Sequence, residues 1–171
     1  MKIKKVEIEG FRAYKNKKDG SFDFTLDGEI PSNFVAIYAP NGFGKSSFYD
    51  AVEWALTDSL ERYAGEHNKK NNQIAARGTK QHRIPLKILR NKDVSDEIVT
   101  RVEVVTTRGD FPRELPKLKW NSTDLALGVS KGKKGKEARI FSKIILSQDA
   151  IDRFLRETKP QERYELFMQH F

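Results

Sequence analysis

Residues 34–47 decide the fold of this chain, and they read Phe34-Val35-Ala36-Ile37-Tyr38-Ala39-Pro40-Asn41-Gly42-Phe43-Gly44-Lys45-Ser46-Ser47. The apolar run from Phe34 to Tyr38 does not alternate, which is typical of a strand buried on both faces of a largely parallel sheet. Beyond this stretch the apolar residues recur at helical spacing, at Phe48, Ala51, Val52, Ala55 and Leu56. The sequence therefore predicts a buried strand, a glycine-bearing loop and a helix in succession, which is the setting of a phosphate-binding loop.

The loop between this strand and this helix has the residue types that a triphosphate cradle requires. Gly42 and Gly44 have no β-carbon, so their backbone can adopt positive φ and the N–H groups of residues 41–45 can turn toward an anion. The helix that starts here adds the positive end of its dipole. We expect Lys45 to contact the β- and γ-phosphates of ATP and the Ser46 hydroxyl to ligate Mg²⁺.

One position departs from the usual pattern G-x-x-x-x-G-K-[ST], because Ala39 stands where the first glycine is expected. Pro40 follows it and favours extended backbone at Ala39, where a methyl group costs little. An ordinary glycine turn before a lysine-containing helix is the alternative. The agreement of strand, loop, Gly-Lys-Ser and helix in one register favours the phosphate-binding loop.

Length and composition limit the protein to a few classes. The 171 residues suffice for one domain with a core, or one domain and a small lobe. The formal charge of +8, from 32 basic and 24 acidic residues, favours an anionic partner besides the nucleotide, most commonly nucleic acid. The absence of cysteine excludes disulfides and thiolate metal sites and favours a cytoplasmic location, and no segment has the length and hydrophobicity of a membrane span.

Further strands are predicted on either side of this loop and helix. Residues 3–10 and 22–26 alternate and are expected to form an antiparallel pair flanking the strand at 34–38. After a polar stretch from 57 to 80, the runs 84–89 and 98–106 predict an antiparallel β-meander, with Asn91-Lys92-Asp93 between them as a turn.

The tract Lys131-Gly132-Lys133-Lys134-Gly135-Lys136 has two interpretations. Flexible lysines suit contact with a phosphate backbone irrespective of sequence. A solvated loop between two elements is the commoner origin of such a tract and is favoured here.

The last thirty residues predict a second strand and a helix. Ile144-Ile145-Leu146 is expected to be a buried strand that places Gln148 at a ligand-binding sheet edge, although a helix start with Ser147 as N-cap is an equal alternative. Thr158-Lys159-Pro160-Gln161 predicts a helix N-terminus. The apolar stripe Tyr164, Phe167, Met168 and Phe171 runs to the last residue, so we expect a fragment of a longer polypeptide.

Groups needed for hydrolysis are missing from the sequence. A P-loop ATPase normally has an acidic residue at the end of a second buried strand, but the best apolar run, 144–146, ends in Ser-Gln. No Ser-Gly-Gly segment is present, and His67, His82 and His170 lack metal-ligand spacing. We therefore expect negligible ATP hydrolysis by this chain alone.

Taken together, these motifs resemble the N-terminal ATPase half of the SMC and SbcC-type DNA-repair family, an ABC-class branch that includes RecF-like proteins. The resemblance is carried by residues 2–12 (KIKKVEIEGFR), by the loop 39–47 (APNGFGKSS), by the helix 48–56 (FYDAVEWAL), and by 146–149 (LSQD) with 160–163 (PQER). The middle of the chain, residues 57–139, matches only as a variable β-lobe.

The resemblance implies an α/β P-loop NTPase fold, as an ABC-type head half with a mixed sheet, an antiparallel β-lobe and a final helix leading into a coiled coil. It divides the chain into a nucleotide-binding core (1–57), a variable loop and β-lobe (58–139), and a Q-loop with the start of the coiled-coil helix (140–171). It also implies that Lys45 and Gln148 are catalytic and that Ser46 and Gln148 hold Mg²⁺. The nucleotide ligands that it implies are Arg12, Asn41, Gly42, Phe43, Gly44, Lys45, Ser46 and Ser47.

For function, the resemblance implies an ATP-dependent head that acts on DNA in repair, chromosome maintenance or anti-phage defence. Its partners would be its own C-terminal ATPase half, a second head bound through ATP, DNA, and a nuclease. Two alternatives remain open from the sequence. One is a nucleic-acid-binding module with a degenerate P-loop, and the other is an ATPase that regulates a nuclease or toxin elsewhere in the full chain.

Overall fold

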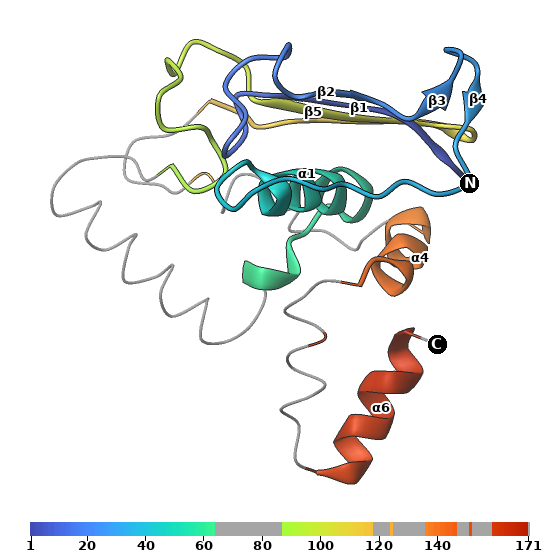
Figure 1. Ribbon diagram of the computed structural model, residues 1–171. Coiled ribbons are helices and arrows are strands. Elements are labelled where there is room, and N and C mark those ends of the chain that lie inside the picture. The colour runs from blue at the N-terminus through green and yellow to red at the C-terminus, as the bar shows by residue number, and fades with distance from the viewer. Residues whose placement is uncertain (64–86, 118–123, 125–135, 147–150, 152–158, 171) are drawn as a thin grey trace, which may run out of the picture.

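A computed structural model describes residues 1–63, 87–117, 124, 136–146, 151 and 159–170. Its strands are β1 (Ile3–Glu9), β2 (Ser21–Asp23), β3 (Thr25–Leu26), β4 (Ile30–Pro31), β5 (Arg101–Thr106) and β6 (Gly109–Glu114). Its helices are α1 (Lys45–Thr57), a 3-10 turn η1 (Glu61–Tyr63), α4 (Lys136–Ile144) and α6 (Pro160–His170). The described residues therefore combine helices with antiparallel sheets in place of the predicted mixed sheet, and α1 covers one face of a sheet (Figure 1).

The main sheet has four antiparallel strands in the order β2-β1-β5-β6. The predicted pairing of residues 3–10 with 22–26 is confirmed, with Val6 opposite Phe22. On the other side of β1, Val6 lies opposite Val104 and Ile8 opposite Val102. These four aliphatic side chains alternate with charged ones along their strands, so all point to the α1 face and are buried there.

The core lies between this sheet face and α1. Trp54 of α1 stacks on Phe11 at a centroid distance of 5.5 Å, and both side chains are buried. Residues Ser47, Asp50, Ala51, Trp54 and Ala55 form the buried stripe of α1, at the i, i+3, i+4, i+7, i+8 spacing of one helix face. Burial of each large side chain contributes about 2 kcal/mol, so the helix that follows the loop is firmly held on the sheet.

The opposite sheet face is covered by charged side chains. Glu7 lies directly opposite Glu103, a like-charge pair that would destabilise the sheet without compensation. Glu7 is compensated by Lys5 at 2.5 Å and Lys17 at 2.7 Å, and Glu103 by Arg101 at 3.0 Å. The hydrogen bond from Lys17, followed by that from Lys5, holds the pKa of Glu7 below its usual value of 4.5.

Strand β6 lies at one edge of the sheet and contains Pro112, which is exposed and stands opposite Glu103. Proline has no N–H to give to a ladder and is tolerated in sheets at such edges. The neighbouring Phe111 points inward and packs edge-on against Phe141 of α4, at 5.3 Å.

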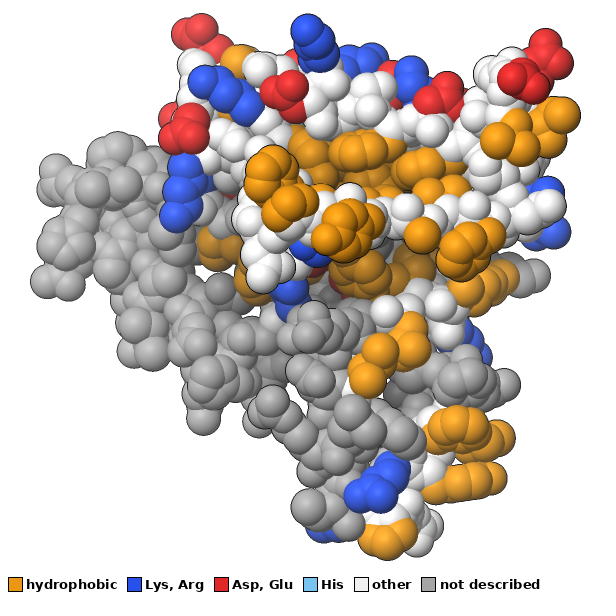
Figure 2. All heavy atoms as spheres, viewed as in Figure 1, with side chains coloured by type: hydrophobic (Ala, Val, Ile, Leu, Met, Phe, Trp, Pro, Cys, Tyr) orange, Lys and Arg blue, Asp and Glu red, His pale blue; other side chains and the backbone are white. Residues whose placement is uncertain are grey.

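The prediction of a buried strand at residues 34–38 is wrong for this structure. Residues 32–40 form no strand, and Phe34 and Tyr38 are 84% and 96% exposed. Figure 2 shows hydrophobic side chains gathered on the face where this segment passes α1. A strand buried on both faces needs neighbouring strands, and among the described residues β1 pairs with β2 and β5 instead.

The prediction of a buried strand at 144–146 is also wrong. Ile144 ends helix α4, and both Ile144 and Leu146 are exposed. Ala138, Phe141 and Ile145 are three and four residues apart, a helical spacing that the run of isoleucines obscured, and Phe141 and Ile145 pack against the core. Gln148 lies outside the described residues, as do the 131–135 part of the lysine tract and the polar stretch 64–80.

The remaining predictions fall partly outside the described residues. Within 98–106 the predicted strand is confirmed as β5, and the predicted turn at 91–93 is present. Residues 84–86 are not described, and 87–89 form no strand. The predicted last helix is confirmed as α6, whose Tyr164, Phe167 and Met168 are exposed. Across the described ranges, no helix combines the length and the apolar character needed to cross a bilayer.

Candidate nucleotide-binding site

The loop before α1 has the backbone conformation expected of a phosphate cradle. Gly42 has φ 89° and Gly44, the N-cap of α1, has φ 89° and ψ 8°, so both adopt the left-handed conformation predicted from sequence. Gly44 offers no side-chain cap, and the first intrahelical bond runs from Phe48 N to Gly44 O at 2.8 Å. The N–H groups of the first turn therefore remain free to bind an anion.

Tyr14 fixes the Gly44 position from the side. Its hydroxyl donates to the Gly44 carbonyl at 3.2 Å, and burial raises the pKa of Tyr14, so the donor proton stays in place at neutral pH. A β-carbon at Gly44 would lie 3.2 Å from the Tyr14 hydroxyl and 3.3 Å from the Ala13 β-carbon. Only glycine fits both this backbone conformation and this space.

Lys45 reaches back across the loop. Its ammonium donates to the carbonyls of Ala39 at 2.5 Å and Pro40 at 3.0 Å, so the residue that departs from the motif takes part through its backbone. Among the described residues no buried carboxylate holds this ammonium, and exchanging two neutral carbonyls for phosphate oxygens would strengthen its hydrogen bonds.

The other expected nucleotide ligands divide into exposed and buried side chains. Asn41, Gly42, Phe43 and Ser46 are exposed, so the Ser46 hydroxyl is open to a cation. The Ser47 side chain is buried, and only its backbone N–H is left to face a phosphate. The residues thus fit a nucleoside triphosphate. In the part of the chain that the structure describes, no group of three His, Asp or Glu side chains could hold a metal, and of the two expected Mg²⁺ ligands only Ser46 lies there.

An arginine cluster lies beside α1 and was only partly foreseen. Asp50 is 1% exposed, and its Oδ2 is 3.0 Å from Arg12 and 3.2 Å from Arg62. Arg12 also donates to the Tyr63 hydroxyl at 2.5 Å. Sequence reasoning missed Asp50, Arg62 and Tyr63. The available signal was an aspartate on the apolar stripe of α1, since a buried carboxylate requires a cationic or hydrogen-bonding partner.

Arg12 is held in an unfavourable backbone conformation. Its φ is 47°, a left-handed conformation that costs a non-glycine residue about 1 kcal/mol or more. The Arg12 N–H donates to the Leu89 carbonyl at 2.7 Å, and the Arg12 carbonyl accepts from Asn91 Nδ2 at 2.7 Å. The loop at 89–91 therefore determines where the guanidinium of Arg12 lies.

Two parts of the predicted site thus meet at α1. Tyr14, in the segment that follows β1, binds the glycine loop. Arg12, in the same segment, pairs with Asp50 in the second turn of α1. Gln148, the remaining predicted site residue, lies outside the described residues.

Several known proteins are similar to this chain in sequence. A family described as "AAA domain" matches residues 5–170. A probable DNA double-strand break repair Rad50 ATPase from Aquifex aeolicus is 28% identical over 165 residues, which cover 95% of this chain and 16% of that protein. The chromosome partition protein Smc of Methylococcus capsulatus is 35% identical over 63 residues, covering 37% of this chain and 5% of the relative.

The structural maintenance of chromosomes protein 3 of Caenorhabditis elegans is 40% identical over 58 residues, covering 34% of this chain and 4% of that protein. The chain thus matches only a small part of each of these relatives' length. Because the AAA domain match spans nearly the whole sequence and the relatives are Rad50 and Smc proteins, the chain belongs to the AAA domain family of P-loop ATPases, in its SMC and SbcC-type branch.

Proposed function

We propose that this chain is the ATP-binding half of an SMC or SbcC-like ATPase head that acts on DNA. The observation that carries the proposal is the glycine loop, in which Gly42 and Gly44 are left-handed, Lys45 spans the turn and Ser46 is open at the start of α1. Lys45 and the loop N–H groups would hold the phosphate tail, and Arg12 would add positive charge beside it. When bound, Mg²⁺ would screen the charge of the phosphates.

Binding of MgATP tests this proposal. Lys45→Ala removes one charge-assisted contact and should weaken binding about tenfold to a hundredfold. Lys18→Ala is the matched control, because Lys18 is an exposed lysine in the turn after Tyr14. Titration of both variants and the parent with a fluorescent ATP analogue measures the difference. Equal affinities for all three would contradict the proposal, and so would a parent protein that binds no ATP at low salt.

The head is proposed to be completed by a further segment of the same polypeptide. The support comes from the exposed apolar segment 34–38, together with Leu26 and Ile30, which are exposed on β3 and β4. Exposed apolar surface of this kind marks an interaction site. The complementing half would cover it and supply the acidic and signature groups, and two completed heads would enclose ATP between them.

Two measurements separate this arrangement from a self-sufficient ATPase. The chain alone should bind MgATP without measurable turnover, whereas the intact head should hydrolyse it with a rate that rises more than linearly with protein concentration. Tyr38→Lys should leave ATP binding by the chain unchanged, since the side chain is exposed, but should prevent its association with the complementing half. Turnover by the chain alone that disappears in Lys45→Ala would contradict the arrangement.

DNA association is supported by how charge is distributed along the sequence. The segments that the structure does not describe contain 11 of the 32 basic residues and 4 of the 24 acidic residues. The described part therefore contains 21 basic and 20 acidic residues. The described residues are thus nearly neutral, with a sheet face of paired charges. We place the DNA contact on the basic segments, including Lys131–Lys136, because closely spaced lysines suit the phosphate backbone.

A further inference from the structure

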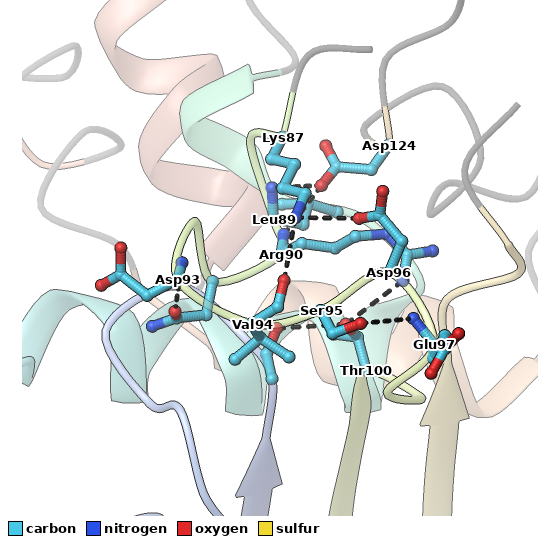
Figure 3. Close-up of polar contacts among 12 residues, drawn as sticks. Lys87, Leu89, Arg90, Asp93, Val94, Ser95, Asp96, Glu97, Thr100 and Asp124 are labelled. Atoms are coloured by element: carbon cyan, nitrogen blue, oxygen red, sulfur yellow. Dashed lines mark hydrogen bonds and ion pairs between the residues drawn. The ribbon is translucent and has the colours of Figure 1, made fainter. Parts of the chain in front are cut away.

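Asp124 is a buried carboxylate that the proposed site does not use. It is 0% exposed, and its oxygens accept hydrogen bonds from three successive backbone N–H groups, those of Ile88 at 2.7 Å, Leu89 at 3.0 Å and Arg90 at 2.7 Å (Figure 3). Consecutive amides that converge on one anion form a nest. Such hydrogen bonds are among the stronger ones in proteins because the acceptor is charged.

The carboxylate fixes the backbone here and makes no ion pair with the guanidinium of Arg90. The guanidinium of Arg90 donates instead to Thr100 Oγ1 and to the carbonyls of Leu115 and Pro116. Asp124 therefore determines the path of the chain at 88–90 irrespective of the side chains there.

A single peptide group connects Asp124 to Arg12. The N–H of Arg90 donates to Asp124, and the carbonyl of the same peptide, that of Leu89, accepts the N–H of Arg12 at 2.7 Å. A hydrogen bond at one end of a peptide polarises the other end, so the carboxylate strengthens the bond to Arg12. Asn91, the next residue, donates its side-chain N–H to the Arg12 carbonyl at 2.7 Å and its backbone N–H to Gly10 at 2.8 Å.

Arg12 depends on this support because of its backbone. With φ at 47°, it would return to a commoner conformation if the loop at 88–91 were free to move. That change would withdraw the guanidinium from Asp50, on the helix that begins at the glycine loop. The nest and the proposed nucleotide site are thus coupled through the hydrogen bond from Arg12 N–H to the Leu89 carbonyl and through the ion pair of Arg12 with Asp50.

We propose that Asp124 is a positioning residue for Arg12: its carboxylate holds the loop at 88–90, which in turn holds Arg12 in the conformation that keeps the guanidinium beside α1. The consequence for nucleotide affinity rests on the proposed function of Arg12, whereas the positional coupling does not.

Native-state hydrogen exchange of the intact protein tests the coupling without any substitution. The amide protons of Arg12, Leu89 and Arg90 should exchange through one common opening, with protection factors that agree within about threefold. An Arg12 amide that exchanges far faster than the nest amides would overturn the proposal.

Asp124→Asn tests it by substitution, because asparagine keeps the shape but loses the charge and presents an N–H₂ group to the amides. Exchange should rise about tenfold at residues 88–90 and also at Arg12. Asp96→Asn is the matched control, since Asp96 lies in the same loop, is exposed and pairs only with Lys87 among the described residues. A rise confined to residues 88–90 would overturn the proposal. Should Asp124→Asn not fold, the native-state exchange of the parent protein still decides the coupling.

MgATP affinity supplies the functional readout. Asp124→Asn should weaken it about threefold to tenfold, and the double variant with Arg12→Ala should bind no more weakly than Arg12→Ala alone. Fully additive losses would show that Asp124 acts independently of Arg12 and would overturn the proposal. A parent protein that binds no MgATP would overturn the proposed function instead, and hydrogen exchange would still decide the coupling.

Discussion

The hydroxyl of Tyr14 donates to the carbonyl of Gly44, so a residue just beyond β1 holds the N-cap of the helix that follows the glycine loop. The tyrosine ring makes an edge-on contact with Phe22 of β2 at 5.6 Å. Tyr14 therefore connects the glycine loop to the sheet. Contacts within the chain thus hold the conformation of the loop.

Tyr14→Phe should keep the fold and weaken MgATP binding. It removes one neutral hydrogen bond, a loss of about 1 kcal/mol, which corresponds to about a fivefold change in affinity. The ring contact with Phe22 remains, so the urea midpoint should change little. Calorimetric titration compares the affinities, and unchanged binding would show that the hydrogen bond does not shape the loop.

Alanine at the two loop glycines should act differently. Both have φ 89°, but a β-carbon at Gly44 would meet Tyr14 and Ala13, whereas nothing lies within 4 Å at Gly42. Gly42→Ala should therefore cost only the backbone strain, about 1 kcal/mol, and Gly44→Ala should cost more and lose MgATP binding as well. Urea denaturation of the pair measures the difference, and equal costs would contradict the close approach at Gly44.

Asp50→Ala should destabilise the protein by about 2 kcal/mol or more, because it leaves Arg12 and Arg62 facing each other without their shared carboxylate. Both arginines keep some access to water, so the loss should fall below that of a fully buried pair. Asp110→Ala, at an exposed position of β6, is the control. Equal unfolding free energies for the two variants would show that the cluster contributes no stability.

Stability should fall in acid partly because of Glu7. Its pKa is lower in the folded protein than in the unfolded chain, so its contribution is present above about pH 4.5 and is lost as pH falls through the folded value. Glu7→Gln should therefore flatten the decline of the urea midpoint between pH 6 and 3, roughly the range of carboxyl titration. Glu97→Gln, an exposed glutamate in a loop, is the control and should follow the parent.

Replacing Lys131, Lys133, Lys134 and Lys136 with neutral residues should weaken DNA binding by the intact protein to the same extent for every DNA sequence. The slope of log affinity against log salt should become less steep by about 0.9 for each lost phosphate contact. Substituting Lys4, Lys15, Lys18 and Lys92 instead gives a variant of equal charge. The same loss in both variants would show that net charge acts without a defined contact at 131–136.

The sequence predicted the parts of this structure that depend on neighbours along the chain. Positive φ at Gly42 and Gly44 follows from the loop motif, and β2 and β5 follow from alternation, as does α6 from its N-terminal signals. The prediction for residues 34–38 was wrong. An unbroken apolar run indicates that a segment needs burial, but it does not show whether neighbouring strands are available to bury it.

The polar networks depend on distant residues and were not predicted. Asp50 pairs with arginines 38 residues before and 12 residues after it, and Asp124 binds amides 34 to 36 residues earlier. A single sequence shows that a carboxylate on the apolar side of a helix needs a partner. It does not show which of 32 basic residues supplies it.

Pro112 gives the sheet a defined end. A polypeptide that approached β6 from outside would find an exposed proline that cannot donate an N–H at that position. The proline thereby hinders a second copy of the chain from pairing its backbone with this edge of the sheet.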